Sequence, residues 1–155
     1  MDPQRQSLYG FSMDLQYGSP AREPLVTNVG LVTSNGPWGH NIMSAEWTFQ
    51  ISYDPGLIAV SIGPGKATHE NIASSRCFGV GIAANDQNVL CSIAGNHHGK
   101  EVDKIAVLTE CGFRFTKAKH IDVLMVDGAA LQVECELFAT NDGGDHTLYI
   151  GKALS

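Results

Sequence analysis

Short runs of β-branched and aliphatic residues, separated by turns that contain glycine or proline, recur along most of the chain. The run from 25 to 33 is rich in valine and threonine and stops at Asn35-Gly36-Pro37, which predicts a strand followed by a loop. Apolar and polar residues then mix from Asn41 onward and broadly alternate up to the turn at Asp54-Pro55-Gly56, which predicts a second strand. The continuous apolar run from Leu57 to Ile62 predicts a third strand, buried on both faces.

Helical signals are few and short. Thr68 is a plausible N-cap, with Glu70 in the first turn of a helix that runs to about Arg76. A second helix is predicted from Val102 to Leu108, before the helix stop at Gly112. Extended segments are predicted at Phe78 to Ala84, Ile121 to Val126, Ala130 to Ala139 and His146 to Ala153. Many strands with two or three short helices favour a mainly β fold, an antiparallel barrel in which closure removes exposed sheet edges.

The length of 155 residues suits one compact domain. We expect an N-terminal arm over the polar residues 1–23 and a single domain over residues 24–155. The formal net charge of -6 argues against general binding of nucleic acid or of acidic membrane surfaces, because both require clustered Lys and Arg. No apolar run approaches the length of a membrane span, and the first residues do not resemble a secretory leader. A cytoplasmic location is therefore expected.

The cysteines and histidines indicate no metal site. The 4 cysteines lie far apart and form no C-x-x-C pair, so reduced and mostly buried thiols are the expected state. His97 and His98 are adjacent, which is poor geometry for chelation on a strand.

The segment from Gly63 to Thr68 is the first candidate for ligand chemistry. Here a buried strand gives way to a helix start, where glycine lets backbone N–H groups approach an anion and the helix dipole favours negative charge. Lys66 and Thr68 would add a cation and a hydroxyl donor. An ordinary Gly-Pro turn with a capping threonine explains the same residues, so this segment alone does not establish an anion site.

Two further segments carry candidate chemistry. The stretch from Asn41 to Thr48 combines amide, hydroxyl, small and aromatic groups, a mixture that suits the faces and the hydrogen-bonding edge of an isoalloxazine ring. Taken alone, Met43 and Trp47 are more often core residues. Asp145 and His146 precede the last strand, as a catalytic dyad or as groups that satisfy the local backbone.

Taken in order, these segments resemble the flavin reductase-like family of FMN-binding split barrels. The resemblance rests on similar strands, turns and short motifs from about Pro24 to Ala153, and no single motif is specific. The matching segments are Val29 to Ser34, Asn41 to Ser44, Ser52 to Pro55, Lys66 to Ile72, Phe78, Gly99 to Ile105, and Gly144 to His146 with Gly151.

The resemblance implies a split barrel that binds FMN near the interface of a homodimer. It places the flavin beside Asn41, Met43, Ser44, Ala45, Glu46 and Trp47, with Ser61, Ile62 and Gly63 along its other side, and its phosphate on Lys66 and Thr68. No catalytic side chain is predicted, because the cofactor carries the chemistry.

The implied activity is that of an oxidoreductase. NAD(P)H would deliver a hydride to the flavin, and electrons would pass to a small-molecule acceptor or a redox partner protein. A non-catalytic FMN-binding electron carrier or flavin reservoir fits the same residues. So does a barrel that has lost flavin, since Glu46 and Trp47 stand where many relatives have small hydroxyl residues. Relatives also usually continue beyond the closing strand with a segment that helps cover the flavin.

Overall fold

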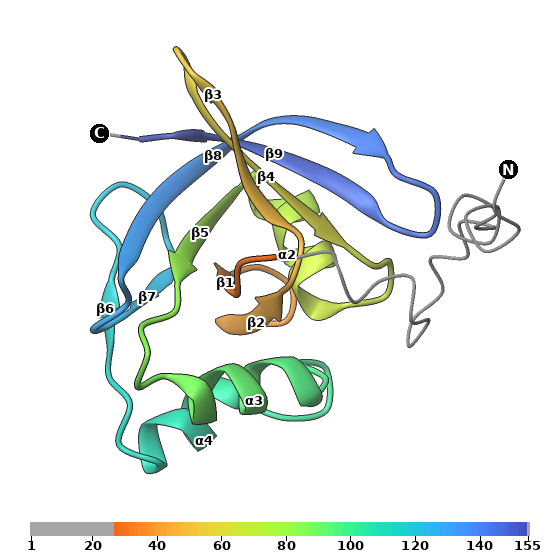
Figure 1. The fold of residues 1–155 in the computed structure, drawn as a ribbon. Coiled ribbons are helices and arrows are strands. Elements are labelled where there is room, and N and C mark those ends of the chain that lie inside the picture. The colour runs from red at the N-terminus through yellow and green to blue at the C-terminus, as the bar shows by residue number, and fades with distance from the viewer. Residues whose placement is uncertain (1–26, 155) are drawn as a thin grey trace, which may run out of the picture.

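The computed structural model describes residues 27–154, and the predicted arm over residues 1–23 lies outside them. Its centre is a seven-stranded antiparallel sheet with the strand order β2-β1-β5-β8-β9-β4-β3. The sheet curls strongly, so that β2 and β4 face each other across its concave side (Figure 1). This is the predicted mainly β, split-barrel architecture.

The bounds of the sheet strands follow the turn signals of the sequence closely. The seven strands are β1 (Gly30–Ser34), β2 (Asn41–Ala45), β3 (Thr48–Tyr53), β4 (Gly56–Ile62), β5 (Cys77–Ile82), β8 (Leu131–Asp142) and β9 (Thr147–Ala153). A separate two-stranded hairpin is formed by β6 (Phe115–Lys117) and β7 (Leu124–Val126). The first strand thus begins later than the predicted 25, and only the end of the predicted strand at 121–126 is extended.

The predicted second strand is wrong in one important respect. The chain turns sharply at Glu46 and Trp47, and β2 and β3 end on opposite edges of the sheet. Thr48 supports this corner, because its Oγ1 donates a hydrogen bond of 3.1 Å to the Ala45 carbonyl. The Ser61 N–H donates to the Trp47 carbonyl at 3.0 Å, which ties the corner to the end of β4.

The described residues form three helices, α2 (Ala67–Ser75), α3 (Asn88–Asn96) and α4 (Lys104–Glu110). Helix α3 was not predicted, because neither end has a strong cap and its buried residues are few. Helix α4 begins two residues later than expected, where Asp103 caps it by accepting a 3.0 Å hydrogen bond from the Ala106 N–H. No helix in residues 27–154 is long and apolar enough to cross a membrane.

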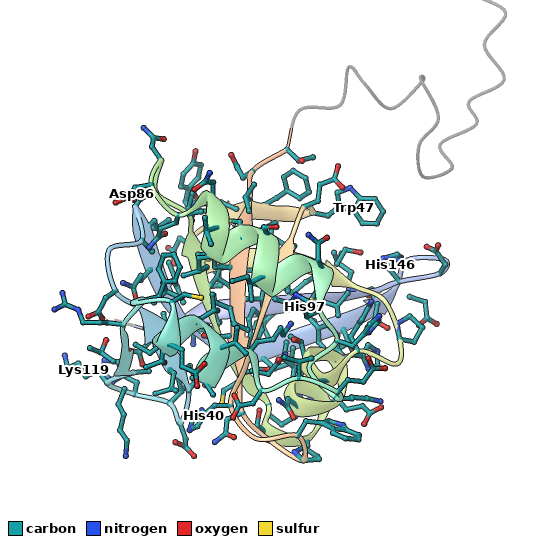
Figure 2. The ribbon with its side chains drawn as sticks, turned by 90° about the horizontal axis from the view of Figure 1, so that it is seen from below. His40, Trp47, Asp86, His97, Lys119 and His146 are labelled. Carbon is teal, nitrogen blue, oxygen red and sulfur yellow. The ribbon has the colours of Figure 1, made fainter. Side chains whose placement is uncertain are left out.

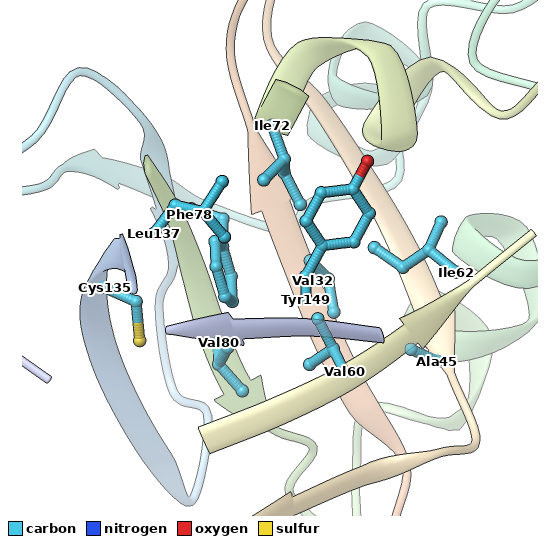
Figure 3. Packing of buried hydrophobic residues seen from close by; sticks show 10 residues of the cluster. All are labelled: Val32, Ala45, Val60, Ile62, Ile72, Phe78, Val80, Cys135, Leu137 and Tyr149. Carbon is cyan, nitrogen blue, oxygen red and sulfur yellow. The ribbon is translucent and has the colours of Figure 1, made fainter. Parts of the chain in front are cut away.

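Two hydrophobic clusters lie on the two faces of the sheet around β1, all of whose residues are buried. Val32 points into the concave side, where Phe78, Ile72 and Tyr149 pack together (Figure 3). Leu31 points to the opposite face, which α3 and α4 cover (Figure 1). This alternation is the expected result of a strand with period two, and it fixes α3 and α4 beside β2, where the candidate site lies.

Candidate functional site

A small cavity brings together five of the residues that the sequence analysis selected. It lies between β2, the start of α2, the end of α3 and the start of α4. The predicted residues in its lining are Asn41, Met43, Ser44, Lys66 and Thr68. These residues come from two segments that are well separated in sequence, so their convergence is a property of the fold.

Two hydrogen bonds hold the β2 side of the cavity. The buried Asn41 side chain donates through Nδ2 to the Thr68 Oγ1 at 2.8 Å, which joins β2 to α2. Ser44 donates through Oγ to the Cys91 carbonyl at 2.7 Å, which joins β2 to α3. Thr68 is therefore not the N-cap that the sequence indicated. The N-cap is Lys66, whose side chain forms no capping hydrogen bond. The Thr68 hydroxyl instead accepts the hydrogen bond from Asn41.

After α3 the backbone passes close to Asn41 and closes the cavity. A Cβ atom at Gly99 would lie only 2.2 Å from the Asn41 Oδ1, so no larger residue fits there without displacing that amide. Gly95 is less restricted, because a Cβ atom there would lie 3.4 Å from the Ser44 Cβ. Glycine at 99 thus allows the backbone to pass directly over the Asn41–Thr68 pair.

The other predicted site residues lie along the corner and the end of β4, outside this cavity. Ala45 and Ile62 are buried in the core, so only their backbone can face a ligand. Trp47 packs against His146 with ring centroids 4.9 Å apart, and a Cβ atom at Gly63 would lie 3.6 Å from the His146 Nε2. Figure 2 shows Trp47, His97 and His146 on one side of the molecule, with Asp86 and Lys119 on the other. Glu46 is exposed at the same corner, and Ser61 is half-buried.

The Asp145-His146 pair is formed, with 2.7 Å between the His146 Nδ1 and the Asp145 Oδ1. Hydrogen bonding to His146 lowers the pKa of the Asp145 carboxyl. Because Asp145 is almost fully solvent-exposed, this pair orients the imidazole beside Trp47 rather than forming a buried acid–base site.

The sequence analysis missed one residue of the cavity, Lys104. This side chain is only 3% exposed, and its Nζ donates to the Ala94 carbonyl at 2.9 Å. Burial, with a smaller contribution from the charge of Lys66, lowers the pKa of Lys104 to about 8. The only sequence signal was its place in the family-like segment from Gly99 to Ile105, to which no role was attached.

The cavity measures about 30 Å³. Sites that enclose a whole drug-sized ligand are about ten times larger or more, so this one admits a compact polar group and not a three-ring system. Its donor set fits an anion, because cationic, amide and hydroxyl groups converge beside the N-terminus of α2. Across residues 27–154, no group of three His, Cys, Asp or Glu side chains is arranged to hold a metal ion.

Comparison with known proteins identifies similar chains. The chain is 31% identical over 111 residues to an NADH-dependent flavin reductase of a Rhodococcus species, which covers 71% of this chain and 56% of that reductase. The chain therefore spans little more than half the length of this curated relative.

Solved structures share the fold. An FMN-binding protein from Thermus thermophilus superposes with a TM-score of 0.78 and 28% identity, covering 90% of this chain and 75% of that one. The flavoredoxin of Desulfovibrio vulgaris (Miyazaki F) gives a TM-score of 0.74 and 26% identity, covering 83% of this chain and 68% of that one. The model of the flavin reductase like domain matches residues 22–155, and the chain belongs to that family.

Proposed function

We propose that this protein binds FMN, accepts hydride from NAD(P)H on the flavin, and passes the electrons to a small-molecule acceptor or a redox partner protein. The observation that carries the proposal is the convergence of Asn41, Ser44, Lys66 and Thr68 on one small polar cavity in a chain of this family. The similarity to an NADH-dependent flavin reductase supports a reductase activity.

In this proposal the protein holds the phosphate and the ring of the flavin in two different environments. The phosphate enters the cavity, where Lys66 and Thr68 hold it, while Asn41 positions the Thr68 hydroxyl. The ring lies along the corner of β2 and β3, bordered by Met43, Ser44, Ala45, Glu46 and Trp47, with Ser61, Ile62 and Gly63 on its other side. When bound, the flavin supplies the hydride-accepting chemistry, and the protein orients it and leaves one face accessible.

A second copy of this chain is the proposed cover for the ring, which the cavity is too small to enclose. The edge strand β3 carries the exposed apolar side chains Phe49, Ile51 and Tyr53, and Phe138 of β8 is also exposed. Exposed apolar side chains on an unpaired edge are typical of an association surface. We expect light scattering to give the mass of a dimer, and Ile51→Arg to shift it toward the monomer while the far-UV spectrum is retained. A wild-type monomer would contradict the homodimer.

The cysteines support a reducing, cytoplasmic setting. All four are free thiols in the structure, and burial raises the pKa of the Cys135 thiol to about 12, which makes that thiol unreactive. Disulfides are rare in reducing compartments.

The alternative function is a non-catalytic electron carrier. It is favoured by the structural similarity to a flavoredoxin and by the exposure of the Asp145-His146 pair, which offers no buried proton donor. The two candidates share the cofactor site and differ only in their reaction with nicotinamide.

One experiment separates these functions. We would record the visible absorption spectrum of the purified protein with added FMN, and then add NADH or NADPH without oxygen. Loss of the flavin bands within the time of enzymatic turnover supports the reductase, while a bound flavin that stays oxidised supports the carrier. If FMN does not bind, the cofactor assignment fails and only the assignment of the fold remains.

A further inference from the structure

A second cavity lies beside Trp38 and has no part in the proposed function. It lies between the loop that joins β1 to β2, the loop that joins α3 to α4, and β7, and it measures about 470 Å³. Among residues 27–154, Gly99 is the one lining residue that it shares with the small cavity beside β2. Figure 2 shows His40, which lines it, well apart from Trp47 and His146. Its volume is that of a site for a whole small molecule, and we refer to it as the Trp38 cavity.

Trp38 forms a fixed aromatic wall of this cavity. Its backbone N–H donates to the Asn71 Oδ1 at 3.0 Å, and its indole Nε1 donates to a carboxylate oxygen of Glu70. The Lys100 Nζ lies 4.8 Å from the centre of the ring, which shows that the indole lies against a cation already. Trp38 nevertheless remains 41% exposed. Because a ring that is held in place before binding loses little conformational freedom when a ligand packs on it, this wall is suited to ligand binding.

The charged side chains of the lining leave an excess of negative charge. Glu70 forms an ion pair with Lys100, which neutralises the lysine of the lining. The other charged lining residues are Glu101 and Asp103, which are exposed and form no ion pair within residues 27–154. Asp103 accepts the capping hydrogen bond of α4 with Oδ1, so its second oxygen can accept from another donor. Two carboxylates beside an indole ring favour a cationic ligand, because both attract positive charge.

The remaining side chains of the lining are apolar, apart from that of His40. Val102, Ile105 and Leu124 are half-buried and form an apolar wall for the hydrocarbon part of a ligand. The buried Nδ1 atom of His40 has no hydrogen-bond partner in the part of the chain that the structure describes. Such atoms are few in native structures, and a neutral imidazole has one nitrogen that accepts a hydrogen bond. Carboxylates and an imidazole beside an apolar wall suit a ligand that carries N–H donors on a hydrocarbon body.

We propose that the Trp38 cavity binds a small organic cation, a primary ammonium group attached to an aromatic or aliphatic body. The ammonium group lies between the Trp38 ring and the carboxylates of Glu101 and Asp103, and the hydrocarbon body packs on the apolar wall. The same carboxylates disfavour flavin phosphates and other anions in this cavity, because like charges close together repel. The inference rests on the cavity and not on the proposed flavin chemistry.

The test compares two probes of the same shape on the full-length wild type. Phenethylamine carries an ammonium group at about pH 7, as a lysine does, and phenethyl alcohol has the same ring and chain with a neutral hydroxyl group. We expect titration calorimetry to show binding of the amine at least about fivefold tighter than binding of the alcohol. Binding of the amine should also change the tryptophan fluorescence, and this change should be lost in Trp38→Phe, which retains Trp47.

Charge-removing variants locate the site. The double substitution Glu101→Gln with Asp103→Asn removes both charges and keeps the shapes of the side chains, and asparagine remains a good helix N-cap. Glu110→Gln is the matched control, because Glu110 is an exposed carboxylate of α4 outside the lining. We expect the double variant to bind the amine no more than about twofold better than the alcohol. The control should keep the wild-type preference.

Three results would overturn the inference: a wild type that does not prefer the amine, a double variant that keeps the full preference, or an equal loss of preference in Glu110→Gln. Saturating FMN should leave the affinity for the amine unchanged, and competition between the two would place the amine at the flavin site instead. If the protein binds no FMN, the proposed function fails, while the titrations with the two probes still decide this inference.

Discussion

Lys100 and Lys104 lie close together in sequence, and the structure places them in opposite environments. Lys100 is exposed at the surface, pairs with Glu70 and lies 4.8 Å from the centre of the Trp38 ring. Lys104 is buried, contacts a backbone carbonyl and faces a cavity to whose lining residues 27–154 contribute no carboxylate. Gly99 directly precedes Lys100 and lines both cavities, of which the one at Trp38 is the larger at about 470 Å³.

The contacts of Lys100 explain its position at the surface, whereas the contacts of Lys104 do not explain why a lysine is buried there. Hydrogen bonds from Lys100 and Trp38 lower the pKa of Glu70, so the surface group is satisfied internally. A solvent-exposed pair of this kind contributes little to stability. Burial lowers the pKa of Lys104, and no carboxylate among residues 27–154 pairs with it. Perturbed groups of this kind cluster at functional sites.

Substitution of Gly99, where the backbone passes close to Asn41, should have the largest effect on stability and on FMN binding. Gly99→Ala places a methyl group against the Asn41 amide, so we expect a loss of about 2–3 kcal/mol in the free energy of unfolding. FMN affinity should fall at least tenfold, because the Asn41–Thr68 hydrogen bond is displaced.

Gly95→Ala is the control for stability in urea unfolding. Its methyl group meets Ser44 at ordinary contact distance, and alanine is about 1 kcal/mol better than glycine within a helix. We expect it to be neutral or stabilising. Equal destabilisation by both substitutions would show that Gly99 is not exceptional.

The two lysines should also differ in their effect on the stability of the flavin-free protein. Lys104→Met removes a buried charge and should raise the free energy of unfolding by about 2 kcal/mol at pH 7. Lys100→Met should change it by less than about 0.5 kcal/mol.

The sign of the pH effect follows from the pKa of Lys104. Its folded pKa of about 8 lies below that of an unfolded lysine, so the unfolded state binds more protons between about pH 8 and 10.4. Wild-type stability therefore rises relative to Lys104→Met over this range, and the advantage of the variant disappears. An advantage that stays constant in denaturant melts from about pH 7 to 10 would show that burial of the charge is not the cause.

A smaller effect is expected from the exposed lysine of the same cavity. Lys66→Ala should weaken FMN binding by about tenfold or less and leave the unfolding transition unchanged, because the side chain is exposed and makes no cap. Increasing salt should reduce the difference between the variant and the wild type in fluorescence titrations. A large loss of stability would instead indicate that Lys66 is part of the fold.

The smallest effect is expected at the surface pair. Glu70→Gln keeps the shape of the side chain and removes the charge that holds Lys100 and Trp38. We expect altered Trp38 fluorescence, with FMN affinity unchanged. A change in FMN affinity comparable to that of Lys66→Ala would mean that the two cavities act together.

Local patterns in the sequence were enough to locate the strands and most of the turns. Period-two alternation and Asn-Gly or Gly-Pro signals are local, so β4, β5, β8 and β9 lie close to where the pattern placed them. The order of short motifs similarly identified the family and the segments that meet at the cavity.

Three features depend on long-range packing: the break at Glu46 and Trp47, the helix α3 and the burial of Lys104. Apolar residues alternate with polar ones through the corner, at Ala45, Trp47 and Phe49, so the pattern contains no signal that β2 and β3 lie on opposite sheet edges. Helix α3 has weak caps and becomes stable by packing Leu90 and Ala94 on the sheet. The environment of Lys104 depends on how α3, α4 and β2 pack together, and a lysine in an exposed or a buried position looks the same in sequence.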